Sequence, residues 1–113
     1  MVAAARGEAF EIPFGGSLQL QYVADAGEAF VRASEVRAEG ASVHNLDGPV
    51  ASVEEIVAAI AAAEPGARIT YGEDPLPFPP EVDSTSFTDL VGGPTARPLE
   101  EGVAEAIERF RAS

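Results

Sequence analysis

The stretch Gln21–Ala33, QYVADAGEAFVRA, decides the fold class because it joins a helix start to a stripe of small apolar side chains. Asp25, with Glu28 three residues later, is typical of a capping box, so we expect Asp25 to cap the helix N-terminus. Small side chains allow close packing, so the stripe predicts a helix lying on a flat surface such as a β-sheet. The apolar positions at helical spacing are Ala26, Ala29, Phe30, Ala33 and Val36.

Two further helices show the same periodicity. Ser52 and Glu55 form a capping box before a helix that ends at Glu64-Pro65-Gly66. The last helix begins near Pro98 and carries a Glu105–Arg109 pair one turn apart. Their apolar stripes are Val53, Ile56, Val57 and Ile60 in the first helix, and Leu99, Val103, Ala106, Ile107 and Phe110 in the second.

Three short segments predict β-strands. Phe10–Phe14 is extended and apolar, and Pro13 within it favours a sheet edge. Ser42–Leu46 is expected to be a buried strand, and Arg68–Tyr71 a third strand. The alternation of strands and helices indicates an α/β fold, with residues 1–113 forming one small domain. Short helices complete the pattern at Val2–Arg6, closed by Gly7, and between Asp83 and Gly92.

The composition is strongly acidic, with 19 Asp and Glu against seven basic residues, all of them Arg, and a net charge of −12. Such a surface repels phosphate backbones and anionic lipids, so neither nucleic acid nor membrane is an expected partner. The absence of Cys excludes disulfides and thiolate ligands and indicates a reducing compartment. The first ten residues hold no long apolar run, so we predict no signal peptide and a cytoplasmic location.

The absence of Lys excludes several kinds of chemistry. A phosphate-binding P-loop, a Schiff base and a Tyr-x-x-x-Lys pair each need the Lys amine. The acidic pairs Glu54-Glu55, Glu73-Asp74 and Glu100-Glu101 do not converge, because adjacent side chains point in different directions. No His, Asp and Glu cluster has metal-ligand spacing. We therefore expect no catalytic residue and no metal site on this chain.

Three stretches, in order, resemble the NAD-dependent epimerases and dehydratases, the extended short-chain dehydrogenase/reductases. LQLQYVADAGEAF, residues 18–30, is similar to the segment that opens their substrate domain. VHNLDGPVASVEEIVAAI, residues 43–60, resembles their Tyr-Asn-Leu-Gly strand, loop and following helix. PLPFPPEVDSTSFTDLVGGPTARPLEEGVAEAIERFR, residues 75–111, is similar to their C-terminal loop, short helix and final helix.

The resemblance implies the C-terminal substrate-binding part of an NAD(P)-dependent oxidoreductase that acts on a sugar or sugar acid. The Gly-rich dinucleotide turn of that family has no counterpart here, and neither Tyr22 nor Tyr71 has a Lys partner. We therefore expect no cofactor on this chain, with NAD or NADP held by a Rossmann half that is not encoded here, and no activity in isolation. A C-terminal fragment, a truncated paralogue and half of a split enzyme all fit this pattern.

By the same resemblance, Ile12, Pro13 and Phe14 line a substrate pocket. An apolar edge packed into the core is the alternative interpretation of these three residues. The family's Arg for the substrate pyrophosphate has no counterpart, because Leu18 lies near the expected position. This difference disfavours nucleotide-linked sugars.

A smaller or neutral small-molecule substrate, sugar-like for example, fits this difference better. Gln19, Gln21 and Tyr22 are the candidates for its polar contacts, and exposed strand amides that face water are the alternative. His44, the only His, is expected to be a hydrogen-bonded structural residue of its strand. Asp83 is expected to cap the short helix that follows it.

Two other functions stay open. The chain is alternatively an acidic protein-interaction module derived from that family, because its apolar helix and strand faces lack their sheet. Its partner would then be the missing Rossmann half or a second copy, with exchange of the N-terminal strand and helix as the expected form of dimer. An independent enzyme that uses carboxylates and His44 would need two converging acids in a deep pocket.

Overall fold

The computed structural model describes residues 1–113 as five helices and four strands. Their mixed order confirms the α/β class. None of the helices combines the length and the apolar character needed to traverse a lipid bilayer. The helices are α1 (Val2–Arg6), α2 (Val23–Ser34), α3 (Val53–Ala63), α4 (Thr85–Val91) and α5 (Leu99–Ala112). The strands are β1 (Ala9–Ile12), β2 (Ser17–Gln19), β3 (Val50–Ser52) and β4 (Arg68–Tyr71).

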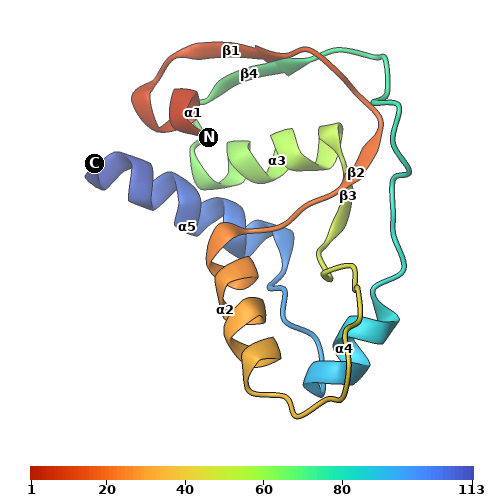
Figure 1. Ribbon diagram of the computed structural model, residues 1–113. Helices are drawn as coiled ribbons and strands as arrows, with labels where there is room; N and C mark the ends of the chain where they lie inside the picture. The colour runs from red at the N-terminus through yellow and green to blue at the C-terminus, as the bar shows by residue number, and fades with distance from the viewer.

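β1 and β4 form a parallel pair, with Ala9 opposite Arg68 at one end and Ile12 opposite Tyr71 at the other. Parallel strands need a long connection, and here that connection contains β2, α2, β3 and α3. Pro13 directly follows β1, where its missing N–H ends the ladder. Figure 1 shows the pair lying over α3.

β2 and β3 form a second, antiparallel pair, with Leu18 opposite Ala51. β3 runs directly into α3, and Ser52 is both the last residue of the strand and the N-cap of the helix. The Ser52 hydroxyl accepts a hydrogen bond from the Glu55 N–H at 3.0 Å, and the Glu55 carboxylate accepts one from the Ser52 N–H at 3.4 Å. The predicted capping box is therefore confirmed, and it sets the point at which strand becomes helix.

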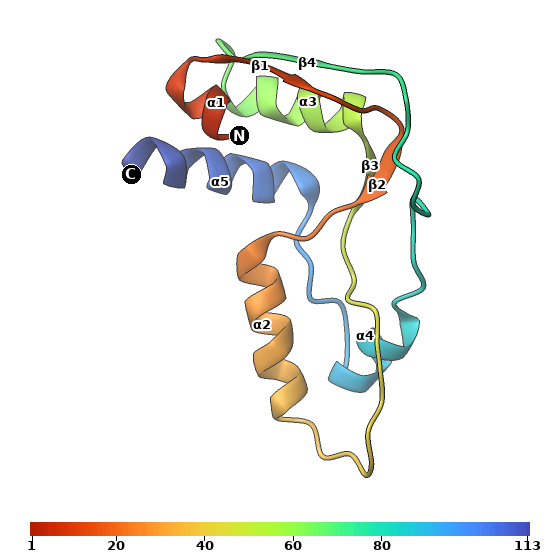
Figure 2. The same cartoon turned by 45° about the horizontal axis from the view of Figure 1, so that its top comes forward.

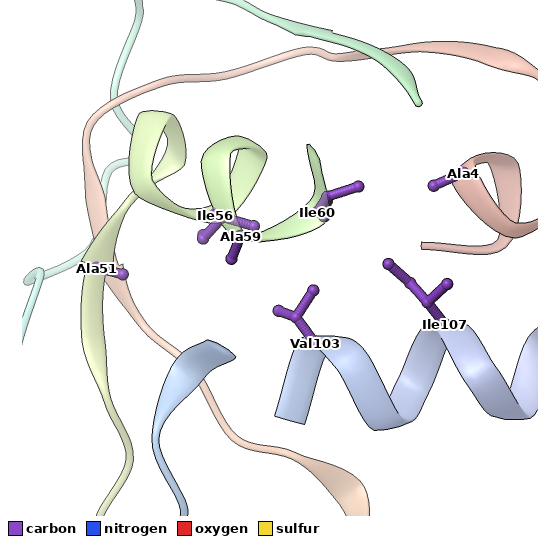
Figure 3. Close-up of a cluster of buried hydrophobic side chains, with 7 residues drawn as sticks. All are labelled: Ala4, Ala51, Ile56, Ala59, Ile60, Val103 and Ile107. Atoms are coloured by element: carbon purple, nitrogen blue, oxygen red, sulfur yellow. The ribbon is translucent and has the colours of Figure 1, made fainter. Parts of the chain in front are cut away.

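The core lies between α1, α3 and α5 (Figure 3). Ile107 is completely buried, and the alanines around it allow the helices to approach closely. Only 13 of the 113 residues are buried, so this core is small for the chain. Its members are Ala4, Ala51, Ile56, Ala59, Ile60, Val103 and Ile107.

α2 and α4 lie apart from this core (Figure 2). Arg32 of α2 donates hydrogen bonds to the carbonyl oxygens of Val91 at 3.0 Å and of Pro94 at 3.1 Å. The Asp47 carboxylate accepts a hydrogen bond from the Thr95 N–H at 2.8 Å. Hydrogen bonds between segments far apart in the sequence therefore stabilise the region that contains α2 and α4.

The predicted strand at Ser42–Leu46 is absent, which corrects the sequence prediction. The segment is irregular, no strand lies beside it, and the Val43 side chain is 97% exposed. A β-strand is stabilised by pairing with another strand. This segment has residues that favour a strand, but it cannot form one without a partner. His44 consequently lies on a loop, and its predicted position in a buried strand is wrong.

The predicted capping role of Asp25 is also wrong. α2 begins at Val23 with Tyr22 at the N-cap, so Asp25 lies inside the first turn. The buried Asp25 carboxylate accepts hydrogen bonds from the Arg97 backbone N–H at 2.9 Å and from Arg97 Nε at 2.8 Å. Asp25 therefore binds the distant Arg97 through both its backbone and its guanidinium, and not the first N–H groups of α2.

The outer side of α2 is uncovered. Ala29 is buried as predicted, but Phe30, assigned to the same stripe, is 70% exposed. Val23 and Val31 are also largely exposed. The stripe is therefore split between the side of α2 that packs on this chain and the side that faces solvent.

The molecule is flat, with principal extents of 50 × 33 × 17 Å. Its radius of gyration is 16.0 Å, against about 13 Å for a compact chain of this length. Its accessible surface of 7286 Å² exceeds the value for a folded 11.7-kDa monomer by roughly 1,400 Å². The chain thus exposes more surface than a self-sufficient domain of its size.

Candidate functional site

Ile12, Pro13 and Phe14, predicted to line a substrate pocket, lie along an apolar groove of about 310 Å³. Val53 and Ile56 line the same groove. Its volume is at the lower end of the range for small-molecule sites. The lining contains no charged side chain, so it offers apolar contact but no Arg for a phosphate. The remaining lining residues are Met1, Phe10, Leu18, Leu20 and Ile60.

The amides of Gln19 and Gln21 are engaged within the chain. Gln19 Nε2 donates to the Leu46 carbonyl at 3.3 Å, and Gln21 Nε2 reaches the same oxygen at 3.5 Å. Gln19 Oε1 accepts from the Val82 N–H at 3.0 Å. These hydrogen bonds connect the end of β2 to the loops that contain Leu46 and Val82. Neither glutamine lines the apolar groove.

Tyr22 belongs to a network of charged side chains instead. The Arg97 guanidinium carbon lies 4.8 Å from the centre of the Tyr22 ring, and Arg97 forms ion pairs with Asp25 and Glu105. Burial, and then the nearby Glu105 carboxylate, raises the pKa of Tyr22. The hydrogen bond with Asp25 is the main reason that the pKa of Arg97 is raised. This environment disfavours the tyrosinate that proton abstraction requires.

A small cavity of about 90 Å³ lies beside this network, lined by Tyr22, Arg97 and Gly102 among others. A water molecule takes up about 30 Å³ in the liquid, so the cavity has room for a few waters and not for a dinucleotide. The six predicted contact residues therefore do not form one site. Ile12, Pro13 and Phe14 share the groove, whereas Gln21 and Tyr22 line the small cavity beside Arg97. Gln19 lines neither and binds two loops.

Most Arg side chains are also engaged within the chain. Three form ion pairs with acidic side chains, and two donate hydrogen bonds to backbone carbonyls. None of them lines the apolar groove. The groove is therefore unsuited to a diphosphate. The engaged residues are Arg32, Arg68, Arg97, Arg109 and Arg111.

His44 has two hydroxyl partners that the sequence did not reveal. Its Nε2 lies 2.7 Å from Ser42 Oγ, and its Nδ1 lies 2.9 Å from Ser86 Oγ. The imidazole centre lies 6.3 Å from that of the buried Phe87 ring. The main cavities do not include this cluster, and acyl transfer needs a substrate pocket beside the nucleophile. The cluster therefore fastens the 42–46 loop to α4.

Two aspartates accept hydrogen bonds from backbone N–H groups. Asp83 Oδ1 accepts a hydrogen bond from the Thr85 N–H at 2.9 Å, and hydrogen bonding with Thr85 lowers the pKa of Asp83. Asp83 therefore binds the first N–H of α4 as predicted, but from the residue before the N-cap, which is Ser84. Asp47, which the sequence analysis did not single out, binds Thr95 and Ala96. The turn signal Asp47-Gly48 was the only indication of that role. No group of three or more acidic or His side chains is arranged to hold a metal ion.

No protein-family model and no curated protein matches this sequence. Three solved structures, however, match almost the whole chain. A partial consensus L-threonine 3-dehydrogenase has 24% identity and a TM-score of 0.81, over 98% of this chain and 40% of that one. The fold is that of part of a GalE-like dehydrogenase.

The other two structures are the GalE-like L-threonine dehydrogenase from Cupriavidus necator. Its holo form has 26% identity and a TM-score of 0.76, over 96% of this chain and 38% of that one. Its apo form has 24% identity and a TM-score of 0.71, over 97% of this chain and 42% of that one. This chain therefore spans about 40% of the length of the dehydrogenases that it resembles.

Proposed function

We propose that this chain is the substrate-side portion of an NAD(P)-dependent oxidoreductase of the dehydrogenase and epimerase kind, and that it turns over no substrate alone. The observation that carries the proposal is the match of at least 96% of the chain to about 40% of solved threonine dehydrogenases. The dinucleotide would be held by a Rossmann portion outside this sequence, since the chain has neither a Gly-rich phosphate turn nor Lys. The accessible surface in excess of that of a folded monomer of this mass supports the proposal that a neighbour of that kind covers part of the chain.

A small substrate fits the groove better than a nucleotide-linked sugar. The groove of Ile12, Pro13 and Phe14 provides apolar contact and no charged side chain. The neighbours are L-threonine dehydrogenases by name, which favours a β-hydroxy amino acid or a similarly small polar molecule over the larger sugar derivatives. Groups that bind its charged ends would then come from the Rossmann portion.

Calorimetry tests the proposal directly. Titrating the purified chain with NAD⁺, NADH, NADP⁺ and NADPH is expected to give no saturable heat, because no helix N-terminus here carries a glycine turn for the pyrophosphate. The intact Cupriavidus necator enzyme, titrated under the same conditions, serves as the positive control. Micromolar binding of any of the four dinucleotides to this chain would overturn the proposal.

The second candidate function is a protein-interaction module, and the exposed Val23, Phe30 and Val31 on α2 favour it. The two functions differ in what a purified complex of this chain with its cellular partner contains. A substrate-side portion is expected to co-purify with bound nicotinamide dinucleotide, detected by its absorbance after extraction. A complex with stoichiometric partner and no dinucleotide would favour the interaction module.

A further inference from the structure

The groove of Ile12, Pro13 and Phe14 is a recess between β1 and α3, and β1 lies over α3 (Figure 1). Side chains alternate between the two faces of a strand. Phe10 and Ile12 accordingly line the groove, and Glu11 between them does not. The inner wall of the recess consists of three buried side chains of α3, which are Val53, Ile56 and Ile60. The groove is therefore a hollow within this chain and not a flat exposed face.

The chemistry of the lining selects an uncharged occupant. No side chain of the groove carries a charge, a hydroxyl or an amide. A polar group buried there would lose its hydrogen bonds with water and find no replacement, whereas a hydrocarbon group gains free energy on leaving water. The charged amino and carboxyl groups of an amino acid therefore do not fit the groove, and an apolar side chain does.

The groove is also larger than the apolar part of threonine. Its volume is about 310 Å³, and a water molecule takes up about 30 Å³ in the liquid, so there is room for roughly ten non-hydrogen atoms. The apolar part of L-threonine is a single methyl group, which would leave most of the lining in contact with water. A larger hydrocarbon group would fill the recess.

We propose that the groove binds the side chain of a β-hydroxy amino acid whose side chain is a bulky hydrocarbon group such as phenyl. The inference rests on the proposed function and names the substrate class of the same site. The charged ends of the substrate lie outside the groove, where the Rossmann portion would bind them. The exposed Val23, Phe30 and Val31 of α2 differ from the groove, because they line none of the main cavities.

Titration of the isotope-labelled full chain, followed by the backbone amide resonances of Ile12, Phe14 and Ile56, tests the inference. The two probes are L-threonine and L-threo-β-phenylserine, which differ only in the methyl or phenyl group on the hydroxyl-bearing carbon. Phenylserine is expected to give saturable shifts at these three amides. Its dissociation constant is expected to be at least about tenfold lower than that of threonine, because each buried methylene strengthens binding about fourfold.

A matched pair of variants locates the binding. Phe10→Ser removes an apolar side chain from the groove and is expected to weaken phenylserine binding at least about threefold. Because Phe10 is 54% exposed, the variant is expected to keep the circular dichroism spectrum of the wild type. Phe78→Ser removes a similarly exposed phenylalanine that lies outside the groove, and it is expected to leave binding unchanged.

Three results would overturn the inference. They are equal dissociation constants for the two amino acids, no saturable binding of phenylserine, and phenylserine binding that Phe10→Ser weakens no more than Phe78→Ser does. Failure of the proposed function has a different signature, because it would appear as binding of a dinucleotide to this chain.

Discussion

Asp25 and Asp47 show how a distant partner decides what a single carboxylate does. Both residues have the local pattern of a helix or turn cap. Asp25 instead binds Arg97, and Asp47 binds the backbone of Thr95 and Ala96. The sequence could identify these side chains as hydrogen-bonding residues, but it could not identify partners that lie about 50 to 70 positions away. Arg97 was missed for the same reason.

Asp47→Asn is expected to lower stability in a pH-dependent way. Burial alone would raise the pKa of Asp47, but the hydrogen bonds from Thr95 and Ala96 outweigh it, so the pKa lies below the ordinary value. A lowered pKa means that the charged form stabilises the fold above pH of about 4, and that this contribution is lost as pH falls through the folded-state pKa. Replacement by Asn is therefore expected to cost about 1 kcal/mol at pH 7.

Urea unfolding at a series of pH values measures this effect. The difference between the wild type and Asp47→Asn is expected to shrink as the pH is lowered from 5 towards about 3. Asp89→Asn, an exposed change on α4, is the control and is expected to have little effect at any pH. A constant difference between Asp47→Asn and wild type across the range would contradict the role of the carboxylate charge.

Among the elements, α3 and the strand Arg68–Tyr71 followed their sequence patterns, β1 overlaps the predicted Phe10–Phe14 strand, and α2 begins before its predicted cap. α1 and α4 end at the predicted glycines Gly7 and Gly92, and α3 begins at its predicted capping box, because a cap acts on backbone within a few positions. β2 and β3 have three residues each and went unpredicted. The segment Ser42–Leu46 has a stronger strand pattern than either, yet it stays irregular because nothing pairs with it.

A pair of glycine substitutions tests how closely the loop before β3 packs against the chain at the end of β2. A Cβ on Gly48 would lie 1.9 Å from the Leu20 carbonyl oxygen, a backbone atom that cannot move freely. Gly48→Ala is therefore expected to cost about 1–3 kcal/mol of unfolding free energy. Gly27→Ala on α2 meets no atom within 4 Å and is expected to stabilise the chain by about 0.5–1 kcal/mol. Urea unfolding curves of the two variants that shift in the same direction would contradict this assignment.

At the scale of the whole molecule, the decisive feature is a core too small for the surface around it. The buried cluster lies between α1, α3 and α5 (Figure 3). α2, in contrast, keeps one apolar side in solvent. The molecule is flat because its four strands form two separate pairs. Neither pair is a central sheet on which helices could pack from both faces. This shape supports the proposal of a portion that is completed by another polypeptide.

Two substitutions compare the covered and uncovered parts of the chain. Phe30→Ser removes a large apolar side chain that faces solvent, so the free energy of unfolding is expected to change by no more than about 0.5 kcal/mol. Ile107→Ala removes a side chain that is completely buried in the core, with an expected cost of about 2–5 kcal/mol. Both values come from urea unfolding at one low protein concentration. A loss of several kcal/mol for Phe30→Ser would show that α2 is covered on both sides.

The sequence by itself determined the α/β class, the acidic surface without Lys, and most helix ends, because caps and helical periodicity act between residues a few positions apart. Only the tertiary structure decided that Val43–Leu46 stays unpaired, that Asp25 binds Arg97, and that the groove of Ile12, Pro13 and Phe14 excludes Gln19, Gln21 and Tyr22. Strand pairs and ion pairs join residues far apart in the chain. Their free energy depends on which neighbours the fold brings together, and no local pattern specifies those neighbours.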